Sequence, residues 1–500
     1  MGAHSVVVAS AAASNSVATP APGATDVAKG RQLVEQLERQ AMEAHEQAQA
    51  LNKQGRFEEA QAKYAEMRRL DAAALEATQA LGCPSCAQAA AAAAASRADA
   101  VQQQQQSGDP QLYQQLHTPS AWTAAASATG GLSIAQRAAG AIIGCCVADA
   151  AATPVQWIYD VAKLQQLLQQ RQQATNGTPA AAADSVGLEF FDPVQSSFLP
   201  MYTTGRNSPY GEQTLLLLRS LAEQAGLHCG RYAELYGASY SSGFDGYMNA
   251  STVAFLRNRA RGLQPPATGA EDQQADCVAR LAPLIAMYAG DERLMRLVEA
   301  ATRTTQNTDA AAAWGCAGAA VLERLLLGQA AEQAVRETVQ ELQQQQNGGG
   351  SMPQPELSAA IAGHLEKVLQ LQQTPHADAV QELGRNCHMP NALQTPIHAV
   401  LHHEWLAAQQ QQQQQQADRS TAGSPLHGLS MEAKQRIFVA AIREVMLAGG
   451  CCASRASYAG ACLGAVLGAE AVPQSWVRRC DAGSDVQAWA AAVCGAREVA

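Results

Sequence analysis

The sequence predicts an all-α protein, and two observations carry this prediction. From Gly131 onward, apolar residues recur at helical spacing, and no stretch alternates apolar and polar residues as a strand would. Small residues, mainly Ala and Gly, are mixed with Leu, Ile and Val, a composition that allows helices to pack closely. We therefore expect a compact, orthogonal helical domain over residues 131–480.

Long apolar periods mark the individual helices of this domain. We expect helical segments at 132–147, 213–225, 277–287, 310–327, 396–406, 436–447 and 454–467. Within and directly after the last of these, Gly460, Gly464 and Gly468 are each four residues from the next. Glycines at this spacing predict close packing against another helix in a soluble core.

Three segments precede the domain. We expect residues 1–28 to be a disordered or targeting tail, because residues 1–25 are rich in Ala and Ser and contain no Asp or Glu. Residues 29–80 predict a helical hairpin broken near Gly55, similar to one tetratricopeptide-type repeat, with a face that could bind a protein. We expect residues 81–130 to form an Ala/Gln-rich linker. We expect Cys83 and Cys86 within it to be incidental thiols without a metal or redox role.

Further low-complexity segments fall within and after the domain. Glutamine runs predict loop insertions near 343–352 and 409–424, because such runs lack the apolar surface that offsets ordering entropy. Residues 481–500 are expected to form a C-terminal tail.

Charge and cysteine usage exclude several classes of protein. The chain has 44 acidic against 34 basic residues, which argues against a nucleic-acid partner. No charge-free apolar run of 18 residues appears, so we expect no membrane-spanning helix. Thirteen cysteines, an odd number that includes adjacent pairs, indicate free thiols and a reducing compartment. We expect a cytoplasmic protein, with a plastid or mitochondrion as the alternative.

Four clusters of polar and small residues lie where predicted helices begin or end. They occupy residues 137–157, 208–214, 304–307 and 449–455. The first contains Gly140, Gly144 and Asp149, followed by Pro154 and Gln156. In order, spacing and helical context, the clusters resemble the motifs of the ADP-ribosylglycohydrolase family, over about 131–480.

The resemblance implies a hydrolase fold that acts on ADP-ribose-like substrates with two divalent ions, usually Mg²⁺. Paired ions of this kind would clamp the substrate and help a water molecule attack. The resemblance assigns catalytic positions to Asp149 and Gln156, ligand-binding positions to Thr305, Asn307, Cys451 and Arg455, and metal positions to Glu212, Gln213, Thr214 and Ser454.

The chain departs from the family pattern at the positions that bind metal. Four of the five carboxylate positions that the resemblance implies hold neutral residues, namely Gln156, Gln213, Cys451 and Ala453, and only Glu212 keeps a charge. Hard cations prefer several carboxylate oxygens, and a thiolate is a poor ligand for magnesium. We therefore expect Mg²⁺ to bind weakly at best.

Three functional readings stay open. The replacements favour a weakly active or non-catalytic protein, similar to the branch of the family that contains the J-crystallins and selenoprotein J. The first alternative is an active hydrolase that cleaves glycosidic bonds of ADP-ribosylated substrates. The second is a thiol-based activity at Cys451 or Cys452, which follow two glycines at a helix start, where thiol pKa values fall.

Overall fold

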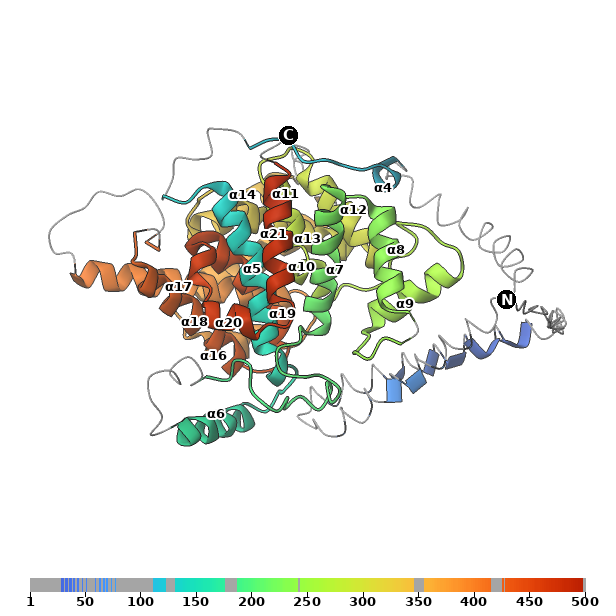
Figure 1. The fold of residues 1–500 in the computed structure, drawn as a ribbon, viewed down its shortest axis with the longest axis horizontal. Coiled ribbons are helices and arrows are strands. Elements are labelled where there is room, and N and C mark those ends of the chain that lie inside the picture. Colours follow the sequence, from blue (N-terminus) through green and yellow to red (C-terminus); the bar gives the residue numbers. More distant parts are fainter. Residues whose placement is uncertain are drawn as a thin grey trace, which may run out of the picture. The chain divides into compact units, whose positions relative to one another are not determined.

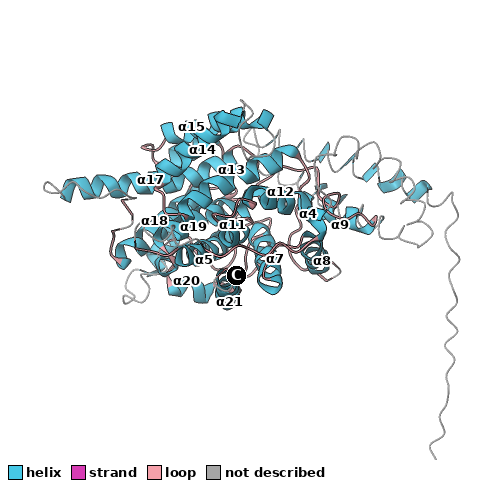
Figure 2. Ribbon diagram, turned by 90° about the horizontal axis from the view of Figure 1, so that it is seen from above, coloured by secondary structure: helices cyan, strands magenta, loops and turns pink. Residues whose placement is uncertain are grey.

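Helices dominate the part of the chain that the computed structural model describes (Figures 1 and 2). This part covers residues 111–122, 131–175, 187–345, 355–414 and 425–497, apart from positions 242 and 427, together with scattered positions between 28 and 77. Within it the structure has isolated β-bridges but no strand, so the all-α prediction is confirmed.

The helices follow one another along residues 105–500, which form one compact unit. They are α4 (Gln111–Gln114), α5 (Ile134–Ala152), α6 (Val161–Thr175), α7 (Pro209–Gln224), α8 (Cys229–Ser239), α9 (Ala250–Ala260), α10 (Asp276–Ala279), α11 (Ala282–Tyr288), α12 (Leu294–Thr305), α13 (Asp309–Leu326), α14 (Ala331–Gln345), α15 (Pro355–Gln370), α16 (His376–Leu383), α17 (Asn391–Gln414), α18 (Met431–Leu447), α19 (Cys452–Leu467), α20 (Gln474–Arg479) and α21 (Gly483–Gly495). Short 3₁₀ helices lie at Thr153–Val155 and Ala469–Ala471. Every predicted helical segment overlaps one or more of these helices.

Helices α5 and α19 cross at the centre of this unit, and glycines set their separation (Figure 1). A Cβ atom on Gly140 would overlap the carbonyl oxygen of Gly464, and one on Gly144 would overlap that of Gly460. The two backbones therefore touch directly, and the prediction of close packing along the α19 glycines is confirmed.

Burial explains the apolar character of α5. The segment Ile134–Val155 is long and apolar enough to cross a membrane by length and composition alone, although it contains Arg137 and Asp149 and so is not free of charge. In the folded chain 94% of its most apolar window is buried, as in the core helix of a domain. A capping box begins the helix, in which the Ser133 side chain accepts from the amide of Gln136.

Two predicted boundaries differ from the structure. The predicted C-terminal tail contains α21, which buries Val486, Ala490 and Val493 against α5 and α7. Its apolar residues recur every three or four positions, so the segment extends the core. The glutamines at 343–345 and 409–414 continue α14 and α17, because glutamine is a good helix former. The rest of each predicted insertion lies largely outside the described residues. Figures 1 and 2 show the glutamine end of α17 projecting beyond the surrounding helices.

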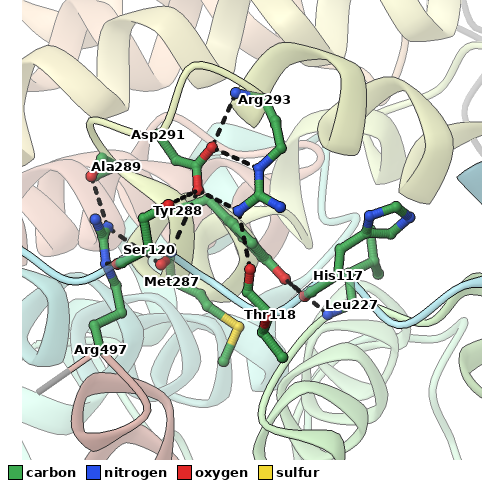
Figure 3. A network of polar contacts seen from close by, with 10 residues as sticks. All are labelled: His117, Thr118, Ser120, Leu227, Met287, Tyr288, Ala289, Asp291, Arg293 and Arg497. Carbon is green, nitrogen blue, oxygen red and sulfur yellow. Dashed lines mark hydrogen bonds and ion pairs between the residues drawn. The ribbon is translucent and has the colours of Figure 1, made fainter. Parts of the chain in front are cut away.

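The predicted linker also contains a packed segment. Residues 117–120 cross the surface of the domain, where the backbone of His117 pairs with Leu227 (Figure 3). The Arg497 guanidinium donates to the carbonyl oxygen of Ser120 at 2.6 Å and lies 3.7 Å from the ring centre of Trp122. Asp291 accepts from the Ser120 hydroxyl at 3.1 Å. We call these contacts the anchor network, which ties 117–122 to α11, α12 and the end of the chain.

The N-terminal unit covers residues 1–104. Its described positions are helical, and Ala44 packs with Met67 and Leu70. The hairpin over residues 29–80 stays a prediction. Residues 1–27, Cys83 and Cys86 lie outside the described residues.

Candidate functional site

Asp149 lies near the end of α5, where it holds the start of α7. Its carboxylate accepts from the amide and hydroxyl of Ser208, at 2.8 and 2.5 Å, and from the Asn207 side chain at 3.0 Å. Ser208 in turn caps α7. A Cβ atom on Gly211 would overlap the Asp149 carboxylate, so this turn of the helix requires glycine. Burial raises the pKa of Asp149 to about 6, although these hydrogen bonds act in the opposite direction.

Glu212 follows in the first turn of α7, and protein donors occupy both of its carboxylate oxygens. Tyr202 donates to one oxygen at 2.9 Å, and the Arg206 guanidinium donates to the other at 2.8 Å. Burial raises the pKa of Glu212 to about 7, and the charge of Arg206 only partly offsets this effect.

Gln213, where the sequence resemblance implies a carboxylate, lies between the acidic Asp276 and the basic Arg280. Its amide group donates to Asp276 at 2.6 Å, and its carbonyl oxygen accepts from Arg280 at 3.0 Å. The same Asp276 oxygen also accepts from Asn249 at 2.6 Å, whereas the second oxygen of Asp276 is buried without a hydrogen-bond partner. An amide can satisfy both neighbours at once, because it combines a donor with an acceptor.

Cys451, at the start of α19, contacts Gln156, which follows the 3₁₀ helix Thr153–Val155. The Gln156 amide group donates to the Cys451 sulfur at 3.3 Å, and its carbonyl oxygen accepts from the backbone amide of Ala453 at 2.7 Å. The hydroxyls of Ser454 and Tyr210 lie 3.0 and 3.5 Å from the same sulfur. The predicted positions Gln156, Cys451 and Ser454 therefore meet.

A second chain of contacts joins Gln306 to this region. Gln306 donates to Asp272 at 2.7 Å, and the amide of Gln274 donates to the same carboxylate at 3.2 Å. The Gln274 side chain then accepts from the thiol of Cys387 at 3.2 Å. Cys387 and Cys451 are themselves hydrogen-bond partners. We call Asp149, Gln156, Glu212, Gln213, Asp276, Cys387 and Cys451 the site cluster.

Three other predicted site residues, Thr214, Thr305 and Asn307, are placed differently. The Thr214 hydroxyl donates back to the Tyr210 carbonyl oxygen within α7. Thr305 is buried at the end of α12. Asn307 accepts from Arg303 at 3.1 Å. Within the cluster 304–307, Gln306 is therefore the residue that contacts an acidic side chain, that of Asp272.

Arg455 is buried, and protein acceptors engage its guanidinium. It donates to the Thr395 hydroxyl and to the carbonyl oxygens of Val445 and Gly449, at 3.0 to 3.1 Å. These bonds fix the turn between α18 and α19. They support a structural role for Arg455, in contrast to the predicted contact with a ligand.

Sequence reasoning missed several members and neighbours of the cluster. These are Tyr202, Arg206, Asn249, Asp272, Asp276 and Cys387. Most lie in loops, where no periodic pattern marks them. The position of Asp276 four residues before Arg280 is the one local signal, since this spacing brings two charged side chains together on a helical turn.

Comparisons with known proteins identify the family of this chain. The ADP-ribosylglycohydrolase family profile matches residues 130–500. Crystallin J1A of Tripedalia cystophora is 24% identical over 71% of this chain and 95% of its own length. Crystallin J1B of the same animal is 22% identical over 72% of this chain and 97% of its own length. A solved ADP-ribosylglycohydrolase-related protein complex aligns with 73% of this chain and 99% of its own, at 20% identity and a TM-score of 0.46. Since the family profile spans well over half of the chain, the protein belongs to the ADP-ribosylglycohydrolase family.

Proposed function

We propose that this protein is a weakly active or non-catalytic member of its family, which binds an ADP-ribose-like small molecule without a working di-metal centre. One observation carries the proposal: protein donors already occupy both oxygens of Asp149 and of Glu212, two of the three carboxylates in the site cluster. Asp149 accepts from Asn207 and Ser208, and Glu212 accepts from Tyr202 and Arg206.

The donor set does not fit two magnesium ions. A pair of such ions brings four positive charges, and oxygen ligands with negative charge must surround them. Here the guanidinium of Arg206 lies 2.7 Å from Glu212 and already supplies the positive charge that this carboxylate attracts. Gln213 and Cys451 contribute no carboxylate, and among the described residues no group of three or more His, Cys, Asp or Glu side chains could hold a metal ion. We therefore derive no catalytic step through magnesium.

Hydrolysis assays with the full chain test this proposal. ADP-ribosyl-arginine and ADP-ribosyl-serine peptides should show no turnover that depends on Mg²⁺ and is lost with a chelator. Robust turnover of either substrate, abolished by the chelator, would overturn the proposal and favour the alternative of an active hydrolase.

Ligand binding is a separate part of the proposal. ADP-ribose at 100 times its dissociation constant should stabilise the folded chain by about 2.7 kcal/mol, with or without added Mg²⁺. If stabilisation appears only when Mg²⁺ is present, the metal centre works and the proposal is wrong on this point.

Restoring acidic side chains at the replaced positions tests the same proposal through a gain in Mg²⁺ affinity. The combined changes Gln213→Asp, Cys451→Asp and Ala453→Asp should raise the affinity for Mg²⁺ at least about tenfold, since a ligand change in the outer shell alone shifts affinity by 10–100-fold. Calorimetric titration of folded protein, checked by circular dichroism, measures this change. Equal affinity in the wild type and the folded variant would show that the replaced carboxylates are not what limits metal binding.

A further inference from the structure

The adjacent cysteines Cys451 and Cys452 lie in different surroundings. The Cys452 thiol is fully buried and points to the carbonyl oxygen of Ala152 at 3.7 Å. The Cys451 sulfur instead faces the side chains of Gln156 and Ser454. Any thiol chemistry at this motif therefore belongs to Cys451, and Cys452 serves as its natural control.

A third cysteine supplies the partner of Cys451. Cys387 lies in the loop between α16 and α17, and the amide of Cys451 donates to the carbonyl oxygen of Arg385 at 2.8 Å, so the two backbones run side by side. The Cys387 and Cys451 thiols are hydrogen-bond partners, and both pack in one apolar cluster with Tyr210. Neither is bonded to another cysteine.

The two thiols differ in character and in exposure. The Cys451 sulfur has the Gln156 amide group at 3.3 Å and the Ser454 hydroxyl at 3.0 Å, and lies 3.5 Å from the Tyr210 hydroxyl. The Cys387 thiol donates to the Gln274 side chain at 3.2 Å. Cys451 is 1% exposed, whereas Cys387 is only half-buried, so a small reagent can approach the pair from the Cys387 side.

We propose that Cys451 and Cys387 form a peroxide-responsive dithiol, a modification site separate from any glycosidase chemistry. The sulfur of Cys451, as thiolate, attacks one oxygen of hydrogen peroxide and breaks the O–O bond; sulfenic acid forms on Cys451 and hydroxide leaves. The Cys387 thiol then attacks that sulfur, a disulfide forms, and water leaves with the thiol proton. Peroxide is reduced as the two thiols are oxidised, and a reducing dithiol reverses the step.

The hydrogen-bond donors around Cys451 give this assignment its chemical basis. A thiolate reacts and a thiol does not, and the start of a helix favours a negative sulfur. Gln156 and Ser454, which replace or continue the family motif, both contact this sulfur. A disulfide would also fasten the loop before α17 to the start of α19, the two elements that carry Cys387 and Cys451.

Peptide mass spectrometry of the oxidised full chain tests the proposal directly. Reduced protein is treated with hydrogen peroxide, its remaining thiols are blocked, and it is digested with trypsin. We expect peptide 386–419 to be linked to peptide 444–455, and the link to disappear with dithiothreitol. Fragmentation should place it on Cys451, and the Cys451 thiol should be lost at least about tenfold faster than that of Cys452.

Three serine variants separate the roles of the cysteines. Cys387→Ser should leave sulfenic acid on Cys451, trapped by dimedone, and Cys451→Ser should abolish both products. Cys452→Ser should leave the disulfide unchanged. Circular dichroism establishes that each variant is folded, and the wild-type experiment does not depend on them. A link through Cys452, or equal peroxide reactivity of Cys451 and Cys452, would overturn the proposal.

Discussion

The anchor network and the site cluster are both built from buried polar side chains, and their carboxylates differ in acidity. In the anchor network, burial alone would raise the pKa of Asp291, but hydrogen bonds and charge from Arg293 outweigh it and lower the pKa (Figure 3). In the site cluster, burial prevails and raises the pKa values of Asp149, Glu212 and Asp276.

Charge compensation explains this difference for Asp291 and Asp276. Arg293 donates to both oxygens of Asp291, at 2.9 and 2.6 Å, so the anion has a partner that matches its geometry. Asp276 accepts from the neutral amides of Gln213 and Asn249, and its second oxygen has no partner. The anchor network therefore stabilises the charged form of Asp291. In the site cluster, the ionised form of Asp276 lowers the free energy of unfolding, and perturbed acids of this kind are common at binding sites.

The largest expected effect comes from the helix crossing next to both regions. Gly460→Ala places a methyl group against the backbone of Gly144, and neither helix can move freely, because α5 also packs against α21. We expect a loss of about 3 kcal/mol in the free energy of unfolding, measured by urea denaturation. Gly363→Ala in α15 is the control: nothing lies within 4 Å of its added Cβ, and it should stabilise the helix by about 0.5–1 kcal/mol. A similar response from both variants would mean that the crossing is not tightly packed.

This crossing was also the feature that the sequence predicted best. The spacing of Gly460, Gly464 and Gly468 can be read directly from the sequence, and this spacing predicts close helix packing. The contact between Cys387 and Cys451 could not be predicted in this way, because a loop brings together residues far apart in sequence. The contacts of Arg455 could not be predicted for a related reason: only the structure shows that carbonyl oxygens surround its guanidinium.

Replacing Arg497 should disrupt the contacts of the anchor network and no others. Arg497 donates to the carbonyl oxygens of Ser120, Met287 and Ala289 and stacks on Trp122, so Arg497→Ala leaves buried acceptors without a donor. We expect a loss of about 2–3 kcal/mol in the free energy of unfolding and faster amide hydrogen exchange at 117–120. Arg478→Ala, at an exposed position of α20, should change stability by less than about 0.5 kcal/mol. Unchanged exchange at 117–120 in Arg497→Ala would contradict the assigned role.

A pair of isosteric variants compares the two kinds of carboxylate. Asp291→Asn removes the charge that Arg293 binds and should cost about 1–2 kcal/mol. Asp276→Asn keeps one carbonyl oxygen for Gln213 and Asn249 and replaces the unpartnered oxygen, so it should change stability by less than about 1 kcal/mol at pH 7. Thermal and urea denaturation of both variants measure these changes. A larger loss in Asp276→Asn than in Asp291→Asn would show that the site cluster depends on its charge after all.

The pH dependence of the same two variants should have opposite signs. For Asp276 the folded pKa is raised, so its contribution to stability is fully present below the unfolded pKa, near pH 4, and is lost as the pH rises toward neutrality. Relative to the wild type, Asp276→Asn should therefore gain about 1 kcal/mol of stability between pH 5 and pH 7.

For Asp291 the folded pKa is lowered, so its contribution to stability is present above pH 4 and is lost as the pH falls. The deficit of Asp291→Asn should accordingly shrink between pH 5 and pH 3.5. Buried His376 and His398, whose pKa values burial lowers, destabilise the wild type and both variants alike in acid, so they cancel in these differences. Parallel curves for the two variants would refute the distinction between a compensated and an uncompensated carboxylate.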